Sequence, residues 1–226
     1  MSLFQKINCT ILAIVTSILC VSTTENKVPC RKHVNDEMKI ALTFDDGPDG
    51  KITDEILDIL DEYGIKATFF VIGKNCEEHP EILERIANNG HEIGNHTYSH
   101  PHLTGLNRSR LSQELRKTEE IVFNITGTKT NLFRPPEGVY SELIAQTCDS
   151  LGYRAILWSV DTTDWRSPDA DKIVGTVLDN ASPGVIILCH DYIAGKSNTP
   201  AALRKFIPCL IEQGYVFVTV SELISL

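Results

Sequence analysis

Residues 39–48 decide the fold, and they are Lys39-Ile40-Ala41-Leu42-Thr43-Phe44-Asp45-Asp46-Gly47-Pro48. The first half is an apolar run of the kind that forms a buried β-strand. The second half places two carboxylates directly before a Gly-Pro turn, which is ordinary turn chemistry. Because adjacent carboxylates repel each other unless a cation neutralises one of them, Asp45-Asp46 is either a solvated turn or part of a site.

Similar apolar runs recur along the chain and alternate with segments of helical spacing. We expect strands at residues 39–44, 66–72, 92–95, 131–134, 154–160, 185–189 and 215–220. Apolar residues that would share one face of a helix lie between them, within residues 52–60, 82–86, 111–125, 140–147, 173–177 and 203–210. This alternation is typical of an α/β fold with a parallel sheet. We predict one domain that forms a closed or nearly closed barrel, with its chemistry at the carboxyl ends of the strands.

The composition fits an ordinary globular chain. The 226 residues are 42% hydrophobic and 23% charged, which favours one or at most two domains. Lys and Arg total 21 against 30 Asp and Glu, so the formal net charge is −9. A nucleic-acid partner is excluded on this ground, because such a protein needs a basic face.

The first residues predict export from the cell. A short polar start that includes Lys6 precedes an apolar run over residues 7–21, which at about 15 residues is short for a bilayer of ~30 Å. Small residues follow at Ser22, Thr23 and Thr24. We predict a secretory signal peptide at residues 1–22, a catalytic domain at residues 23–226, and no membrane span after cleavage. An uncleaved signal anchor is the alternative.

The cysteines have a meaning that depends on this cleavage. Removal of residues 1–22 would leave five of the seven cysteines in an oxidising compartment: Cys30, Cys76, Cys148, Cys189 and Cys209. Position alone suggests a disulfide between Cys30 and Cys209, near the two ends of the chain, although sequence does not determine connectivity.

Two histidines follow the third expected strand. His96 and His100 are four residues apart, a spacing that would bring two imidazoles to one face of a helical turn, as metal sites require. Together with Asp46 they would form a set of two histidines and one carboxylate that leaves open positions for water and substrate. His102 is an alternative second ligand, but Pro101 interrupts the turn before it, which favours His100.

Polar residues also follow three later strands. Arg134, which cannot lose its charge, ends the strand at 131–134. Asp164 and Trp165 follow the strand at 154–160, and His190 follows the strand at 185–189. A histidine that emerges from a buried strand is suited to act as a general acid or base, and an acid beside an indole suits both histidine tuning and sugar stacking.

The order of these motifs resembles that of the polysaccharide deacetylase family, the NodB-homology group or carbohydrate esterase family 4, which includes chitin deacetylases and peptidoglycan N-acetylglucosamine deacetylases. The resemblance rests on five ordered motifs that cover essentially the whole mature chain, namely residues 43–48, 96–100, 134–138, 161–165 and 188–190. It implies a single distorted (β/α) barrel with about seven parallel strands.

The resemblance also implies a set of roles. A divalent metal would be held by Asp46, His96 and His100, with zinc favoured over cobalt or another divalent ion. Asp45 would be the general base, oriented by Arg134. His190 would protonate the departing amine and Asp164 would support its positive charge. Trp165 and Leu188 would shape the pocket around the acetyl methyl group.

One residue departs from the family pattern. Position 137 is usually aromatic in the family, where it forms a wall of the groove and offers its backbone N–H to the oxyanion. Here it is Glu137. The backbone donor survives, but the stacking wall is lost and a carboxylate stands near developing negative charge.

The prediction is therefore a secreted, metal-dependent hydrolase that removes acetyl groups from N-acetylglucosamine residues of a cell-wall or spore-wall polysaccharide such as chitin. Glu137 motivates an alternative, a wall-associated carbohydrate-binding or structural protein that keeps the fold and the metal without turnover. An iron oxygenase with the same ligand types is disfavoured because it would leave Asp45, Arg134 and His190 without roles.

Overall fold

The structure is a computed structural model that describes residues 37–167, 169–193 and 195–224. The expected signal peptide at residues 1–22 and the expected partner Cys30 lie outside these residues. Cys76, Cys148, Cys189 and Cys209 form no disulfide with one another. No helix of the described residues combines the length and the apolar character that a membrane span needs.

One parallel sheet forms the centre of the described chain. Its strands run in the spatial order β5-β4-β3-β2-β1-β7-β6, and β8 pairs with the first half of β1. The strands are β1 (Lys39–Asp45), β2 (Thr68–Val71), β3 (Glu92–Asn95), β4 (Leu132–Phe133), β5 (Arg154–Ala155), β6 (Val160–Asp161), β7 (Ile186–His190) and β8 (Val216–Val218). The prediction of a distorted (β/α) barrel with about seven parallel strands is confirmed.

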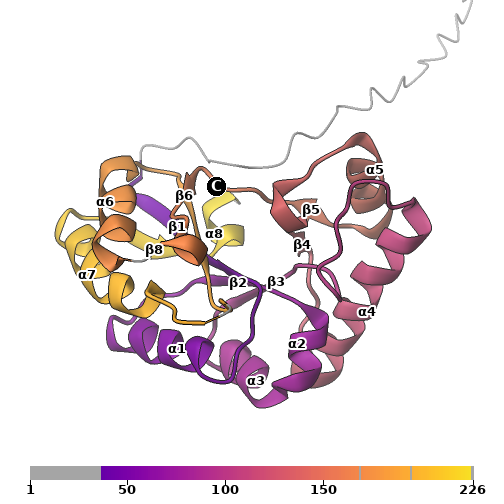
Figure 1. Cartoon of the computed structure of the whole chain (residues 1–226), viewed down its shortest axis with the longest axis horizontal. Helices are drawn as coiled ribbons and strands as arrows, with labels where there is room; N and C mark the ends of the chain where they lie inside the picture. The colour runs from indigo at the N-terminus through magenta and orange to yellow at the C-terminus, as the bar shows by residue number, and fades with distance from the viewer. Residues whose placement is uncertain (1–36, 168, 194, 225–226) are drawn as a thin grey trace, which may run out of the picture.

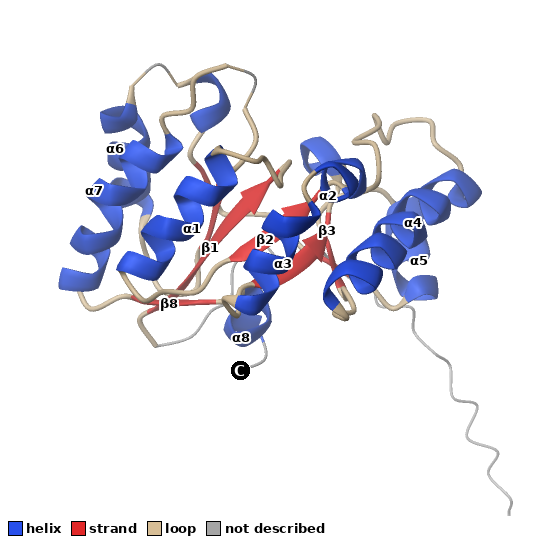
Figure 2. Ribbon diagram, turned by 90° about the horizontal axis from the view of Figure 1, so that it is seen from below, coloured by secondary structure: helices blue, strands red, loops and turns tan. Residues whose placement is uncertain are grey.

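Helices cover the outside of the curled sheet, except the last one, which packs against the inner face beside Ala41 and Phe70. They are α1 (Ile52–Glu62), α2 (Gly73–Glu78), α3 (Pro80–Asn88), α4 (Arg108–Thr126), α5 (Glu142–Leu151), α6 (Ala170–Asn180), α7 (Thr199–Glu212) and α8 (Val220–Ile224). Figure 1 shows α6 and α7 on the left, α1 and α3 below, and α4 and α5 on the right of the strands. Figure 2 shows α1, α3, α6 and α7 packed along one side of the sheet. Two short 3₁₀ helices, η1 (Pro136–Gly138) and η2 (Asp164–Arg166), follow β4 and β6.

The sheet differs from the prediction at its two edge strands. The single strand expected at 154–160 is two short strands, β5 and β6, at opposite ends of the spatial order. Within the described residues no pairing joins them, so the sheet is a curled half-barrel. The Arg134 guanidinium lies in this opening, where Nε and Nη2 each lie 3.4 Å from the carbonyl oxygens of Ile156 and Leu157, respectively.

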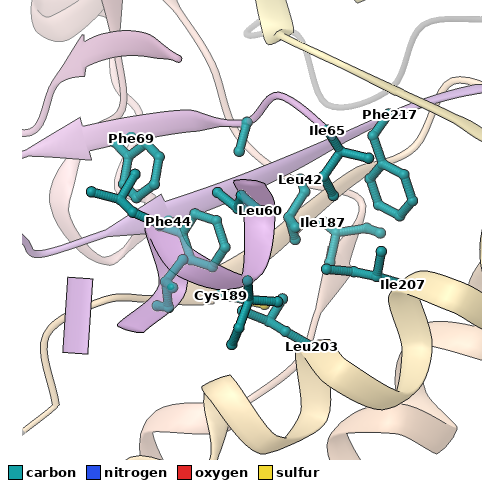
Figure 3. Close-up of a cluster of buried hydrophobic side chains, with 14 of the residues drawn as sticks. Leu42, Phe44, Leu60, Ile65, Phe69, Ile187, Cys189, Leu203, Ile207 and Phe217 are labelled. Atoms are coloured by element: carbon teal, nitrogen blue, oxygen red, sulfur yellow. The ribbon is translucent and has the colours of Figure 1, made fainter. Parts of the chain in front are cut away.

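The two faces of β1 explain how a core and a site share one strand. Side chains of a strand alternate between faces, and Ile40, Leu42 and Phe44 join the large cluster beneath α1 and α7. Figure 3 shows Phe44, Leu42 and Ile187 among Leu203 and Ile207 of α7. Burial of each such side chain is worth about 1.5–3 kcal/mol. The alternate residues Ala41, Thr43 and Asp45 are also buried but become polar toward the carboxyl end.

Candidate active site

Asp45 is held at the carboxyl end of β1 by a buried arginine. Arg134, fully buried, places Nη1 2.7 Å from Asp45 Oδ1 and 2.7 Å from Thr43 Oγ1. Its guanidinium also lies 4.1 Å from the centre of the Phe70 ring. Burial lowers the pKa of Arg134, but the charge of Asp45 and its hydrogen bond oppose this, so the guanidinium stays charged. Within the described residues no hydrogen bond reaches Asp45 Oδ2, which lies 3.9 Å from His96 Nε2.

Asp46, His96 and His100 come together beside Asp45. Asp46 Oδ1 lies 3.4 Å from Nε2 of each histidine, and the ring centres of the histidines are 5.1 Å apart. His96 Nδ1 lies 2.7 Å from the carbonyl oxygen of Arg134, to which it must donate, so Nε2 is free to act as a ligand. Asp46 Oδ1 is buried and has no hydrogen-bond partner.

This arrangement fits a divalent metal ion. The three ligand atoms lie within 4.8 Å of one another, and imidazole and carboxylate ligands are those that zinc and related ions use. An orphaned buried oxygen that faces two imidazole nitrogens is costly without a cation. Burial alone would raise the pKa of Asp46, but His96 and His100 lower it. Burial alone would lower the pKa of His96, but Asp45 and Asp46 raise it.

The histidines reach this position through a loop, which corrects the expected helical turn. Thr97 and His100 have φ values of 72° and 50°, in the left-handed region, so residues 96–100 do not continue as a helix. The first amides of α2 hold the loop, because Gly73 N donates to Thr97 O at 3.0 Å and Lys74 N to Tyr98 O at 2.9 Å. The spacing therefore predicted correctly that His96 and His100 lie close together, but a loop and not a helical turn brings them there.

Glu114 of α4 is a second support of this loop that sequence reasoning missed. It is buried, and its Oε2 accepts from Tyr98 N at 3.0 Å and from Ser99 N at 2.9 Å. Its Oε1 accepts from Ser99 Oγ at 3.1 Å and pairs with Arg110 Nη2 at 2.9 Å. The sequence could have pointed to Glu114, because its spacing places it on the same helix face as Leu111, Leu115 and Thr118. An acid on a buried face needs a partner.

His190 and Asp164 form a second polar pair at the same sheet edge. His190 ends β7 opposite Asp45, and its Nδ1 lies 2.7 Å from Asp164 Oδ1. Trp165 N donates to Oδ1, while His190 N and Thr199 Oγ1 donate to Oδ2. Burial alone would lower the pKa of His190, but the hydrogen bond and charge of Asp164 raise it to about 9. His190 is therefore held as an imidazolium that can give a proton.

Asp191 fixes the turn that carries Asp46. Its Oδ1 accepts from Gly47 N at 2.9 Å and its Oδ2 from Thr53 Oγ1 at 2.8 Å. A side chain at Gly47 would place its Cβ 2.0 Å from Asp191 Oδ2, so glycine is required there. Burial raises the pKa of Asp191 to about 7, against these hydrogen bonds.

The predicted substrate-binding residues lie in different surroundings. Leu188 is buried in β7, whereas Trp165 is 54% exposed. Glu137 is exposed in η1, and its Oε1 lies 3.1 Å from His102 Nδ1. His102 is therefore outside the three-residue cluster that holds His100.

The fold and the site define a class of protein: a parallel (β/α) half-barrel with an Arg-held carboxylate and a two-histidine, one-carboxylate cluster at the carboxyl edge of its strands. The family model described as polysaccharide deacetylase matches residues 32–156. The chain belongs to this family.

Known relatives share most of the chain. A peptidoglycan-N-acetylglucosamine deacetylase of Bacillus cereus is 44% identical over 186 residues, which are 82% of this chain and 68% of the relative. The crystal structure of the Bc1960 peptidoglycan N-acetylglucosamine deacetylase has a TM-score of 0.84 at 41% identity and covers 87% of this chain and 92% of that one.

Two further solved structures differ in what they are said to do. A family 4 acetyl xylan esterase of Clostridium thermocellum, solved with a cobalt ion, has a TM-score of 0.79 at 35% identity and covers 83% of this chain and 90% of its own. BA3943 of Bacillus anthracis, described as a family pseudoenzyme, has a TM-score of 0.81 at 30% identity and covers 87% and 69%. The fold therefore occurs both in a protein described as an esterase and in one described as a pseudoenzyme.

Proposed function

We propose that this protein is a secreted, divalent metal-dependent N-deacetylase that removes acetyl groups from N-acetylglucosamine residues of a wall polysaccharide. One observation carries the proposal: the unpartnered Asp46 Oδ1 faces two imidazole nitrogens next to the Arg-held Asp45. The names of the relatives, which are peptidoglycan and chitooligosaccharide deacetylases, support this substrate class.

Asp46, His96 and His100 would hold the metal, for which zinc is proposed and cobalt is the alternative. When bound, the ion would lower the pKa of a water molecule and polarise the acetyl carbonyl. Asp45 would accept the proton of the attacking water on Oδ2, since Arg134 occupies Oδ1. Arg134 orients that carboxylate and balances its charge.

His190 would complete the reaction on the leaving side. Its imidazolium, supported by Asp164, would donate a proton to the departing nitrogen as the C–N bond breaks. Water thus supplies OH to the acetyl carbon, and the products are acetate and a sugar ammonium group. The Glu137 backbone N–H, for which no partner occurs in the described residues, would donate to the oxyanion.

The test is acetate release from a panel of N-acetylglucosamine oligomers, peptidoglycan and native wall, with and without added metal. We expect Asp45→Asn to lower turnover by about 10²–10⁴-fold while metal binding measured by calorimetry is retained. Full activity of Asp45→Asn would show that Asp45 is not the general base. Full activity after exhaustive chelation would show that the reaction does not need a metal.

A second candidate function is a wall-associated carbohydrate-binding protein that keeps the metal but does not turn over glycan. It is favoured by Glu137, whose carboxylate stands where the family places an aromatic wall, and by the existence of a pseudoenzyme with the same fold. Acetate release from any glycan of the panel rules it out. Glycan binding with no acetate release by the metal-loaded protein favours it.

Secretion is part of the proposal and has its own test. Mature protein recovered outside the cell should begin near residue 23, which N-terminal sequencing would show. A membrane-bound form that retains residues 1–22 would instead support the signal anchor.

A further inference from the structure

Glu137 and His102 form an exposed pair that bridges two loops of the site. The side chains are 52% and 85% exposed, respectively, and Glu137 Oε1 lies 3.1 Å from His102 Nδ1. His102 follows the proposed ligand His100 by two residues. Glu137 follows Arg134 by three residues, and the carbonyl of Arg134 accepts from His96. The pair therefore connects the loop that carries both proposed histidine ligands with the loop that carries Arg134.

The backbone fixes where Glu137 stands. Glu137 has a φ of 58° and Gly138 one of 68°, so two successive residues are in the left-handed region. Gly138 packs closely on the Trp158 ring, because a Cβ there would lie 2.8 Å from the indole. Gly138 N and Val139 N donate to Pro135 O and Pro136 O. A tight turn with an aromatic ring beneath it thus holds Glu137 at the rim of the site.

One oxygen of the Glu137 carboxylate, Oε2, remains available as a hydrogen-bond acceptor. His102 faces Oε1, and no described residue contacts Oε2 through a hydrogen bond or ion pair. The nearest cation along the chain, Arg134, is buried and already bonded to Asp45 and Thr43. A neutral acetamide gains little from such an oxygen, whereas an ammonium group gains a charge-assisted hydrogen bond.

We propose that Glu137 is a specificity-determining residue that binds an ammonium group on the glycan, so that the preferred strand is a partly deacetylated glucosamine polymer. This inference rests on the proposed function. Hydrolysis of R–NH–CO–CH₃ by water gives CH₃–COO⁻ and R–NH₃⁺, so the reaction itself creates the group that Glu137 would bind. The protein would then favour strands on which it, or another deacetylase, has already acted.

The experiment measures binding of glucosamine oligomers, which carry ammonium groups and no acetyl group to remove. Kd is determined by calorimetry for the metal-loaded wild type and for Glu137→Gln, which keeps the size of the side chain, at a pH where the sugar amines are protonated. We expect the substitution to raise Kd by about two- to fivefold, the range for an exposed ion pair. The difference should shrink as salt is added.

The matched control is Glu212→Gln, which removes an exposed charge from the end of α7, at the opposite edge of the sheet. It should leave Kd unchanged. An equal rise in both variants would assign the attraction to the overall negative charge and overturn the proposal. An unchanged Kd in Glu137→Gln would also overturn it.

A turnover comparison separates this inference from the proposed function. Acetate release from partly deacetylated oligomers should exceed that from fully acetylated ones in the wild type, and Glu137→Gln should remove the preference. If no glycan releases acetate, the proposed function fails. The binding comparison still decides the role of Glu137, because glucosamine oligomers need no turnover.

Discussion

Two polar clusters lie at the same edge of the sheet, one around Asp164 and one around Asp46. The Asp164 cluster is complete, because both carboxylate oxygens have hydrogen-bond donors, whereas the Asp46 cluster is incomplete, because Oδ1 has none. Asp164 accepts from four donors, namely His190 Nδ1, His190 N, Trp165 N and Thr199 Oγ1. Asp46 Oδ1 lies 3.4 Å from two imidazole nitrogens and accepts from neither. The complete cluster has all its acceptors paired with donors and can keep a proton on His190. The incomplete cluster has an unpaired carboxylate oxygen, which suits it to bind a cation.

The largest effect is expected from Asp46→Asn, because it breaks the incomplete cluster. Asparagine tolerates the φ of 78° at this position, so the fold should survive. Acetate release should disappear and added zinc should no longer raise Tm, whereas the wild type should gain Tm with zinc by mass action. Without metal, the variant should lose little stability, since no hydrogen bond to Oδ1 is lost and an amide NH₂ in its place can donate to a histidine Nε2.

Asp164→Asn is the matching change in the complete cluster, and its metal-free stability should fall. Every partner of Asp164 is a donor, so an amide NH₂ would face a donor in either orientation, at a cost of about 1–3 kcal/mol. Thermal unfolding of both chelated variants tests the contrast. Equal loss of stability in Asp46→Asn and Asp164→Asn would show that the two clusters do not differ in this way.

The pH dependence of Asp164→Asn sharpens the same contrast. The pKa of His190 is raised from 6.5 to about 9 in the wild type. The stability that this shift provides is therefore present in full below about pH 6.5 and is lost as pH rises toward 9. The gap in unfolding free energy between the chelated wild type and variant should narrow over that range.

The turnover of Asp164→Asn should fall by about 10²–10⁴-fold, and the alkaline limit of its activity should move to lower pH. If the alkaline limit of activity does not move, His190 is not the general acid.

The chemistry-bearing residues at the strand ends could be predicted from the sequence, because each has a type that is unusual after an apolar run. Asp45, His96, Arg134 and His190 were found in this way. The helical turn at 96–100 was wrong because the loop takes its shape from hydrogen bonds with Gly73 and Lys74 of α2 and Glu114 of α4, each 15 or more positions from its partner. The break of the strand at 154–160 was missed because sheet closure depends on the whole barrel, and the local pattern is continuous.

The supporting acids were beyond the sequence for the same reason. The sequence indicates no role for Asp191, because its bonds to Gly47 and Thr53 cross about 140 positions of the chain. Glu114 shares a helix face with Leu111, Leu115 and Thr118, unlike the exposed Glu120, but the sequence does not show which groups it binds. Burial and partners, which only the fold provides, separate a structural acid from a solvated one.

The smallest effect is expected from Glu114→Gln, which tests how far the incomplete cluster depends on support from outside it. Glu114 Oε2 accepts from two consecutive amides, Tyr98 N and Ser99 N, while Oε1 pairs with Arg110. A glutamine oxygen can take only one of these two positions, and the NH₂ group then faces a donor at the other. The loop would then hold His96 and His100 less firmly, and zinc affinity should fall by about tenfold, as for residues that orient metal ligands. The exposed Glu120→Gln on the same helix is the control and should bind zinc as the wild type does. A purely structural role predicts a lower metal-free Tm with unchanged zinc affinity. A fall in affinity therefore shows that the order of this loop is part of the metal site.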